Sequence, residues 1–246
     1  MARDRPDGGQ PAAVQGGELT EGSTRAEIDA FLEKARGMAP TTQPGKRGRL
    51  IFALDATMSR QPTWDQACVL QAEMFREAAR IGGLDVQLVY YRGLGECRCS
   101  RWISDANQLA DLMQKIECRG GNTQIAKVLA HARRETGKAG VQALVFVGDA
   151  MEESVDDLSA RSGELGLLGV PVFAFQEGGD ATVERAFREM ARLSRGAFCR
   201  FDPGAVHQLG ELLRAAAAYA AGGLKALSDL SRRQNAGAVR LLAQMR

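Results

Sequence analysis

Short apolar runs alternate with longer amphipathic segments over most of the chain. The first run, Leu50 to Leu54, is apolar at every position, which is typical of a strand buried on both faces of a parallel sheet. The segment 63–81 then has apolar residues at helical spacing and stops at Gly82 and Gly83. Glycine is common just beyond a helix end because it adopts the left-handed conformation found there. The pattern therefore begins with a buried strand followed by a helix.

The same alternation continues to about residue 221. Further strands are expected at 86–91, 96–103, 141–147, 170–175 and 197–201, and helices at 105–117, 123–136, 154–168, 181–194 and 204–221. We expect the strand at 96–103 to lie at an edge of the sheet and to run antiparallel. Strands that alternate with helices indicate βαβ units. The expected fold class is α/β: a three-layer, Rossmann-like open sheet, mostly parallel with one antiparallel edge strand, and with helices on both faces.

Four segments are expected along the chain. Residues 1–22 are rich in Gly and contain few large apolar groups, so they predict a disordered N-terminal tail. Residues 23–47 predict an amphipathic helix, capped by a serine or threonine, and a linker rich in Pro and Gly. The α/β domain is expected to span 48–221. Residues 222–246 predict a C-terminal helical extension.

Composition narrows the class of protein. The chain has 246 residues, a formal net charge of +2 and 45% hydrophobic residues, which is ordinary for a globular protein. A charge of +2 gives no general attraction to nucleic acid, and no stretch approaches the roughly 20 apolar residues of a membrane span. The first residues lack the apolar stretch of a secretory signal. With an odd number of cysteines, five, this start favours reduced thiols and a cytoplasmic location.

Histidine is scarce, which limits the chemistry available to a site. Only His131 and His207 are present, so a metal site with three histidines is excluded. The sequence also lacks the glycine-rich phosphate-binding loop and the serine elbow of hydrolases. Oxygen groups are therefore the candidates for any site.

Polar oxygen groups gather where the expected strands end. Asp55, Thr57 and Ser59 follow the first strand, and Asp149 follows the strand at 141–147; Thr123 follows two glycines at the start of a helix. Open α/β sheets bind ligands beyond the carboxyl ends of their strands. In an extended segment, residues two apart point the same way, so one carboxylate and two hydroxyls can converge. Such hard oxygen ligands suit Mg²⁺, with Mn²⁺ as an alternative ion.

This pattern resembles the von Willebrand factor A (VWA) domain and its metal-ion-dependent adhesion site. That family carries an Asp-x-Ser-x-Ser motif after the first strand, a Thr in a later loop and an Asp after the fourth strand. The matching residues are Asp55, Thr57, Ser59, Thr123 and Asp149. Thr57 stands where the family usually has Ser; it keeps the hydroxyl but adds a methyl group.

The resemblance implies a protein-interaction module and no enzyme activity. A bound Mg²⁺ would be completed by an acidic side chain of a protein partner. The bacterial intracellular members of the family are the most similar, since no secretion signal is seen. We expect the partner to contact a rim around the ion formed by Arg60, Gln61, Glu152 and Glu153.

Two alternatives remain open from the sequence. One is a Mg²⁺-dependent phosphohydrolase that uses Asp55 as nucleophile, although the second Asp of the dehalogenase motif is replaced by Thr57. The other is a scaffold whose metal site has degenerated and whose amphipathic termini make the contacts.

Overall fold

The computed structural model describes residues 47–203 and 205–245. The expected tail, 1–22, and the expected helix in the segment 23–47 lie outside the described residues. Within them, six strands form one sheet in the order β3-β2-β1-β4-β5-β6. The strands are β1 (Gly48–Asp55), β2 (Leu84–Arg92), β3 (Glu96–Cys99), β4 (Ala143–Gly148), β5 (Val172–Glu177) and β6 (Ala197–Phe201).

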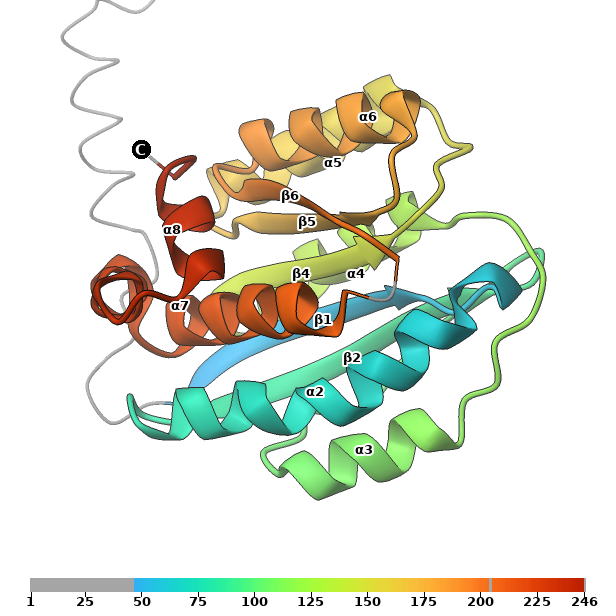
Figure 1. The fold of residues 1–246 in the computed structure, drawn as a ribbon. Coiled ribbons are helices and arrows are strands. Elements are labelled where there is room, and N and C mark those ends of the chain that lie inside the picture. The colour runs from blue at the N-terminus through green and yellow to red at the C-terminus, as the bar shows by residue number, and fades with distance from the viewer. Residues whose placement is uncertain (1–46, 204, 246) are drawn as a thin grey trace, which may run out of the picture. The chain divides into compact units, whose positions relative to one another are not determined.

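Helices cover both faces of this sheet (Figure 1). They are the 3-10 helix η1 (Met58–Arg60) and the α-helices α2 (Gln61–Ala79), α3 (Ala106–Gln114), α4 (Ile125–Lys138), α5 (Val155–Leu167), α6 (Ala181–Leu193), α7 (Val206–Arg232) and α8 (Ala236–Leu242). The two buried clusters divide these helices: α2, α3, α7 and α8 contribute to one, and α4, α5 and α6 to the other. The result is the expected three-layer arrangement.

Strand pairing agrees with the expected fold class. β1 pairs in parallel with β2 and β4, β4 with β5, and β5 with β6. β3 pairs antiparallel with β2 at the edge. The edge strand is shorter than expected because regular pairing ends at Cys99; beyond it, Ser100 N donates to Leu88 O and a bridge joins Val86 to Ile103. The mostly parallel sheet with one antiparallel edge strand is confirmed.

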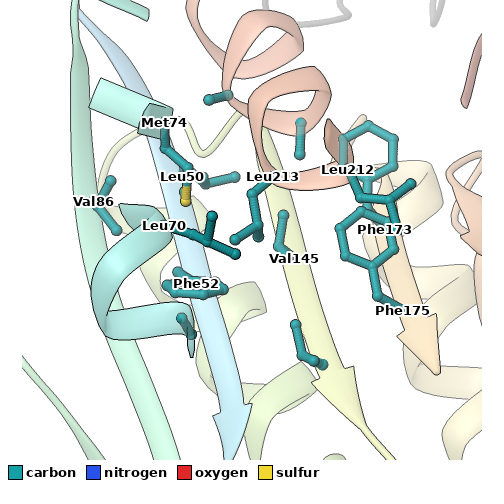
Figure 2. Close-up of a cluster of buried hydrophobic side chains, with 14 of the residues drawn as sticks. Leu50, Phe52, Leu70, Met74, Val86, Val145, Phe173, Phe175, Leu212 and Leu213 are labelled. Carbon is teal, nitrogen blue, oxygen red and sulfur yellow. The ribbon is translucent and has the colours of Figure 1, made fainter. Parts of the chain in front are cut away.

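A large apolar cluster fills the space between the sheet and helices α2 and α7. Figure 2 shows Phe52 and Val145 from neighbouring strands beneath Leu70 of α2 and Leu213 of α7. All of these residues are buried. Because side chains alternate between the faces of a strand, Ile51 and Ala53 pack into the other cluster, under α4, α5 and α6. Burial on both faces explains why β1 is apolar at every position from Leu50 to Leu54.

The chain beyond residue 221, expected as an extension, packs against the rest of the fold. α7 continues to Arg232 through a kink at Gly222 and Gly223, where Gly223 has φ of 66°. Leu227 and Leu241 beyond the kink are fully buried in the same cluster as the first half of α7. The glycine pair therefore redirects the second half of α7, and the leucines of this half and of α8 are buried in the same cluster.

A side-chain hydrogen bond caps the start of α8. Asn235 is the N-cap, and its Oδ1 accepts a hydrogen bond of 2.7 Å from the backbone N–H of Ala238. We expect Asn235→Ala to lower the free energy of unfolding by about 1 kcal/mol, the usual effect of losing a cap. Urea denaturation measures this change, and Asn235→Asp, which keeps the acceptor, is the matched control. Equal losses in the two variants would contradict the capping role.

Candidate metal centre at the carboxyl edge of the sheet

Three loops come together where β1, β2 and β4 end. These strands are parallel, so their carboxyl ends lie on the same edge of the sheet. The loop before α4 joins the end of β1 through a hydrogen bond of 2.9 Å from Arg119 N to Ala56 O. It also joins the turn after β2, since Asn122 N donates to Gly93 O at 3.2 Å. Residues far apart in sequence are thereby gathered at one edge.

Close backbone contact explains one of the glycines in the loop before α4. A Cβ atom added at Gly121 would lie 2.1 Å from the carbonyl oxygen of Gly93. No side chain fits at that distance, so the two loops can pack this closely only because residue 121 is glycine. This contact fixes the loop that carries Thr123.

Asp55 is the most deeply placed of the predicted ligands. It ends β1 and is 1% exposed. Its Oδ1 accepts a hydrogen bond of 2.7 Å from the backbone N–H of Thr57, while its Oδ2 is buried and has no hydrogen-bond partner among the described residues. Burial raises the pKa of Asp55; hydrogen bonds from Thr57 oppose the shift, and the charge of Asp149 adds to it. The buried hydroxyl of Tyr91, opposite Asp55 in the pairing of β1 with β2, is the other polar group near this carboxylate: burial and then the charge of Asp55 raise the pKa of Tyr91.

Hydrogen bonds connect the next three predicted ligands. The hydroxyl oxygens of Thr57 and Ser59 lie 3.3 Å apart. The hydroxyl of Ser59 donates to Oδ2 of Asp149 at 3.2 Å. Oδ1 of Asp149 is buried and has no hydrogen-bond partner among the described residues. Asp55, Thr57, Ser59 and Asp149 therefore form one connected group from two strand ends.

Thr123 lies at the same edge but its hydroxyl is engaged elsewhere. The hydroxyl accepts a hydrogen bond of 3.1 Å from Glu152 N and donates to Glu152 Oε2 at 3.4 Å. The backbone N–H of Thr123 also donates to this carboxylate, at 2.9 Å. Glu152 is exposed and ties the loop after β4 to the loop before α4. A ligand role for Thr123 would require its hydroxyl to turn from Glu152 to the ion.

The other predicted rim residues have varied surroundings. Glu153 accepts hydrogen bonds from the backbone N–H groups of Ile125 and Ala126, at 2.5 and 2.9 Å, so its carboxylate stabilises the start of α4. Gln61 is half-buried and donates to Asp65 within α2. Met58, which we did not single out from the sequence, is 63% exposed between two predicted ligands.

Arg60 differs from its expected position on the rim, because its side chain is only 2% exposed. Its guanidinium forms an ion pair with Glu177 at the end of β5, and Thr63 also donates to that carboxylate. Nε of Arg60 lies 3.8 Å from Oδ1 of Asp149. Burial lowers the pKa of Arg60, and the charges of Asp149 and Asp55 oppose the shift. A charged residue three positions before the helix expected at 63–81 is normally exposed. The sequence pattern therefore did not indicate that Arg60 is buried.

Glu177 is a site residue that sequence reasoning missed. It follows a buried strand, as Asp55 and Asp149 do. The rule that polar residues at strand ends line the site would have included it.

The donor set fits a hard divalent cation. Two carboxylates each have one buried oxygen without a hydrogen-bond partner among the described residues, Asp55 Oδ2 and Asp149 Oδ1. Hydroxyls of Thr57 and Ser59 lie beside them. In residues 47–203 and 205–245, no group of three His, Cys, Asp or Glu side chains is arranged to hold a metal. The proposed set would contain only two such side chains, with hydroxyls and water supplying the other oxygens that Mg²⁺ requires.

Comparison with solved structures identifies the fold. The SpRpn10 VWA domain superposes with a TM-score of 0.54 and 12% identity, covering 70% of this chain and 95% of that domain. The vWF domain of the type V pili tip protein Mfa5 from Porphyromonas gingivalis gives a TM-score of 0.55 and 10% identity, covering 70% and 94%.

An aerotolerance-related membrane protein from Bacteroides fragilis gives a TM-score of 0.51 and 18% identity, covering 69% of this chain and 98% of that one. No protein-family model matches the sequence, and no curated protein matches it. At these identities the likeness shows the fold: the chain has the α/β fold of VWA domains. Among the described residues, no helix is both long enough and apolar enough to cross a membrane.

Proposed function

We propose that this protein is a metal-dependent protein-interaction module. Mg²⁺, or Mn²⁺ in its place, binds at the carboxyl edge of the sheet and recruits an acidic side chain of a protein partner. The observation that carries the proposal is a pair of buried carboxylate oxygens, Asp55 Oδ2 and Asp149 Oδ1, that have no hydrogen-bond partner within residues 47–203 and 205–245 and lie beside the hydroxyls of Thr57 and Ser59. A buried carboxylate oxygen without a partner is costly, and a bound cation removes that cost.

Each residue has a defined part in this proposal. Asp55 anchors the ion, and the hydroxyls of Thr57 and Ser59 coordinate it. Asp149 binds it directly or through water, and Thr123 contributes its hydroxyl from the facing loop. With Asp149 bound through water, Asp55 is the one carboxylate bound directly, so the ion and its direct ligands keep a net charge of about +1 and attract a further acidic ligand. Met58 and Gln61 lie beside the ligands in sequence and would contact the partner around that ligand.

The fold comparison supports an interaction role and leaves an enzyme role without specific support. One solved neighbour is a pilus tip domain, which is compatible with binding at an exposed edge. A phosphohydrolase would need a basic side chain near Asp55 that is free to bind the phosphate of its substrate. Arg60, whose charge acts on Asp55, is buried and paired with Glu177. The cytoplasmic location and intracellular bacterial type expected from the sequence remain part of the proposal.

Capture of the partner with and without the ion tests the function. The full chain is immobilised and incubated with extract of the source cells in Mg²⁺ or in excess EDTA. We expect a retained protein that EDTA releases and that Asp55→Asn fails to retain. Asp111→Ala, which removes an exposed carboxylate on α3, is the matched control and should behave as the unaltered chain does. Retention that is equal in Mg²⁺ and in EDTA would contradict the proposal and favour a scaffold with a degenerate metal site.

A further inference from the structure

Arg60 is held next to the candidate ligands by both its backbone and its side chain. It is the last residue of η1, and its backbone N–H donates to the carbonyl oxygen of Thr57 at 3.0 Å. Its guanidinium is buried and paired with Glu177. Because the backbone of Arg60 is bonded to Thr57 and its guanidinium is paired with Glu177, the positive charge has a defined position relative to the candidate ligands.

The position of that charge matters because of one oxygen atom. Nε of Arg60 lies 3.8 Å from Oδ1 of Asp149, a distance within ion-pair range but too long for a hydrogen bond. Both atoms are buried and have no hydrogen-bond partner among the described residues. Oδ2 of the same carboxylate already accepts the hydroxyl of Ser59. Oδ1 is therefore the Asp149 oxygen with no hydrogen bond from the described residues, and it is the oxygen that Arg60 faces.

A divalent ion and a guanidinium cannot share this oxygen without a cost. Each is attracted to the carboxylate, and each repels the other at short range, where little water screens the charges. The pairing of Arg60 with Glu177 does not involve Asp149, so an ion bound to Asp149 leaves that ion pair intact. The ion must then displace the attraction between Arg60 and Asp149 and accept a positive charge nearby.

We infer that Arg60 is a built-in competitor for the Asp149 carboxylate and sets how tightly the site holds its ion. This inference rests on the proposed metal-dependent function. With Arg60 in place, the site is partly neutralised without metal and binds the ion weakly enough to exchange it. Glu177 is the positioning residue, because it holds the guanidinium against Asp149.

Three variants of the full chain test the inference by calorimetric titration with MgCl₂. Arg60→Gln removes the competing charge, and we expect it to lower the Kd for Mg²⁺ about tenfold, as expected for losing one close charge that is partly screened. Arg60→Gln/Glu177→Gln keeps the net charge of the cluster and avoids leaving Glu177 unpaired, and it too should bind more tightly than the unaltered chain. Arg119→Gln removes an exposed cation from the neighbouring loop and should leave the Kd unchanged.

The outcomes separate this inference from the proposed function. Tighter binding in both Arg60 variants, with no change in Arg119→Gln, supports it. If the unaltered chain binds Mg²⁺ and folded Arg60 variants bind equally or more weakly, the inference is wrong while the metal site stands. An equal gain in Arg119→Gln would show an effect of total charge and would also overturn it. If none of the four proteins binds Mg²⁺, both the inference and the proposed function fail.

Discussion

Asp55→Asn is expected to weaken Mg²⁺ binding by about 100-fold or more, which is at or above the upper end of losses seen when groups supporting a metal ligand are removed. The variant keeps an oxygen that can accept the hydrogen bond from Thr57 N. It removes a charge that is almost fully buried, in a site where burial raises the pKa of this carboxyl group. The loss of affinity should therefore occur without loss of folding.

Calorimetry and urea denaturation together check this prediction. In EDTA, the free energy of unfolding of Asp55→Asn should equal or exceed that of the unaltered chain, because an unfavourably buried charge is gone. In saturating Mg²⁺ the order should reverse, since only the unaltered chain gains stability from the ion. An Asp55→Asn protein that binds Mg²⁺ as tightly as the unaltered chain would remove Asp55 from the site.

Glu177→Ala should lower the free energy of unfolding by about 3 kcal/mol. The substitution leaves the guanidinium of Arg60 buried without its main partner, and unpaired buried charges cost about 3–5 kcal/mol. The lower end applies because Asp149 remains 3.8 Å from Nε of Arg60. Thr63 also loses its hydrogen-bond acceptor.

A double substitution distinguishes the lost ion pair from lost packing. Arg60→Met/Glu177→Leu replaces both charges by apolar groups of similar length, and such replacements of a buried ion pair are often neutral or stabilising. Urea denaturation should therefore give the double variant a free energy of unfolding closer to the unaltered chain than Glu177→Ala has. A double variant less stable than Glu177→Ala would show that the pair itself contributes net stability.

The candidate site was predictable in its components because of its position. Asp55, Thr57, Ser59 and Asp149 follow buried strands, and parallel strands bring their carboxyl ends to one edge. The structure joins these four residues through hydrogen bonds. Position at a strand end did not indicate the hydrogen-bond partner of each group. Thr123 bonds to Glu152, and Glu153 accepts hydrogen bonds from backbone N–H groups at the start of α4.

Arg60 shows most clearly what the pattern could not reveal. Its place before an amphipathic helix favours exposure, and arginine is seldom buried without a partner. That partner, Glu177, lies 117 positions later in the chain, at the end of β5. Only the packing of β5 beside β4 brings the two charges together.

The C-terminal segment illustrates the same limit. Its leucines predicted an amphipathic helix, but the hydrophobic pattern did not indicate which part of the fold they pack against. In the structure, α8 packs against α7 and β6, and Gln244 exchanges hydrogen bonds of 2.8 Å with the backbone of Phe198 at the free edge of the sheet. An edge strand has backbone groups to satisfy, and here a distant side chain satisfies them.

By itself, the sequence determined the fold class, because hydrophobic periodicity reports how each segment is buried whatever its neighbours are. It also indicated most of the oxygen groups at the carboxyl edge, all but Glu177, because that edge follows from strand direction. The tertiary structure alone decided the pairing of each charge, since burial and partners depend on residues distant in the chain. The carboxylate oxygens without a hydrogen bond from the described residues, and the arginine that faces one of them, emerge only when the strands are assembled.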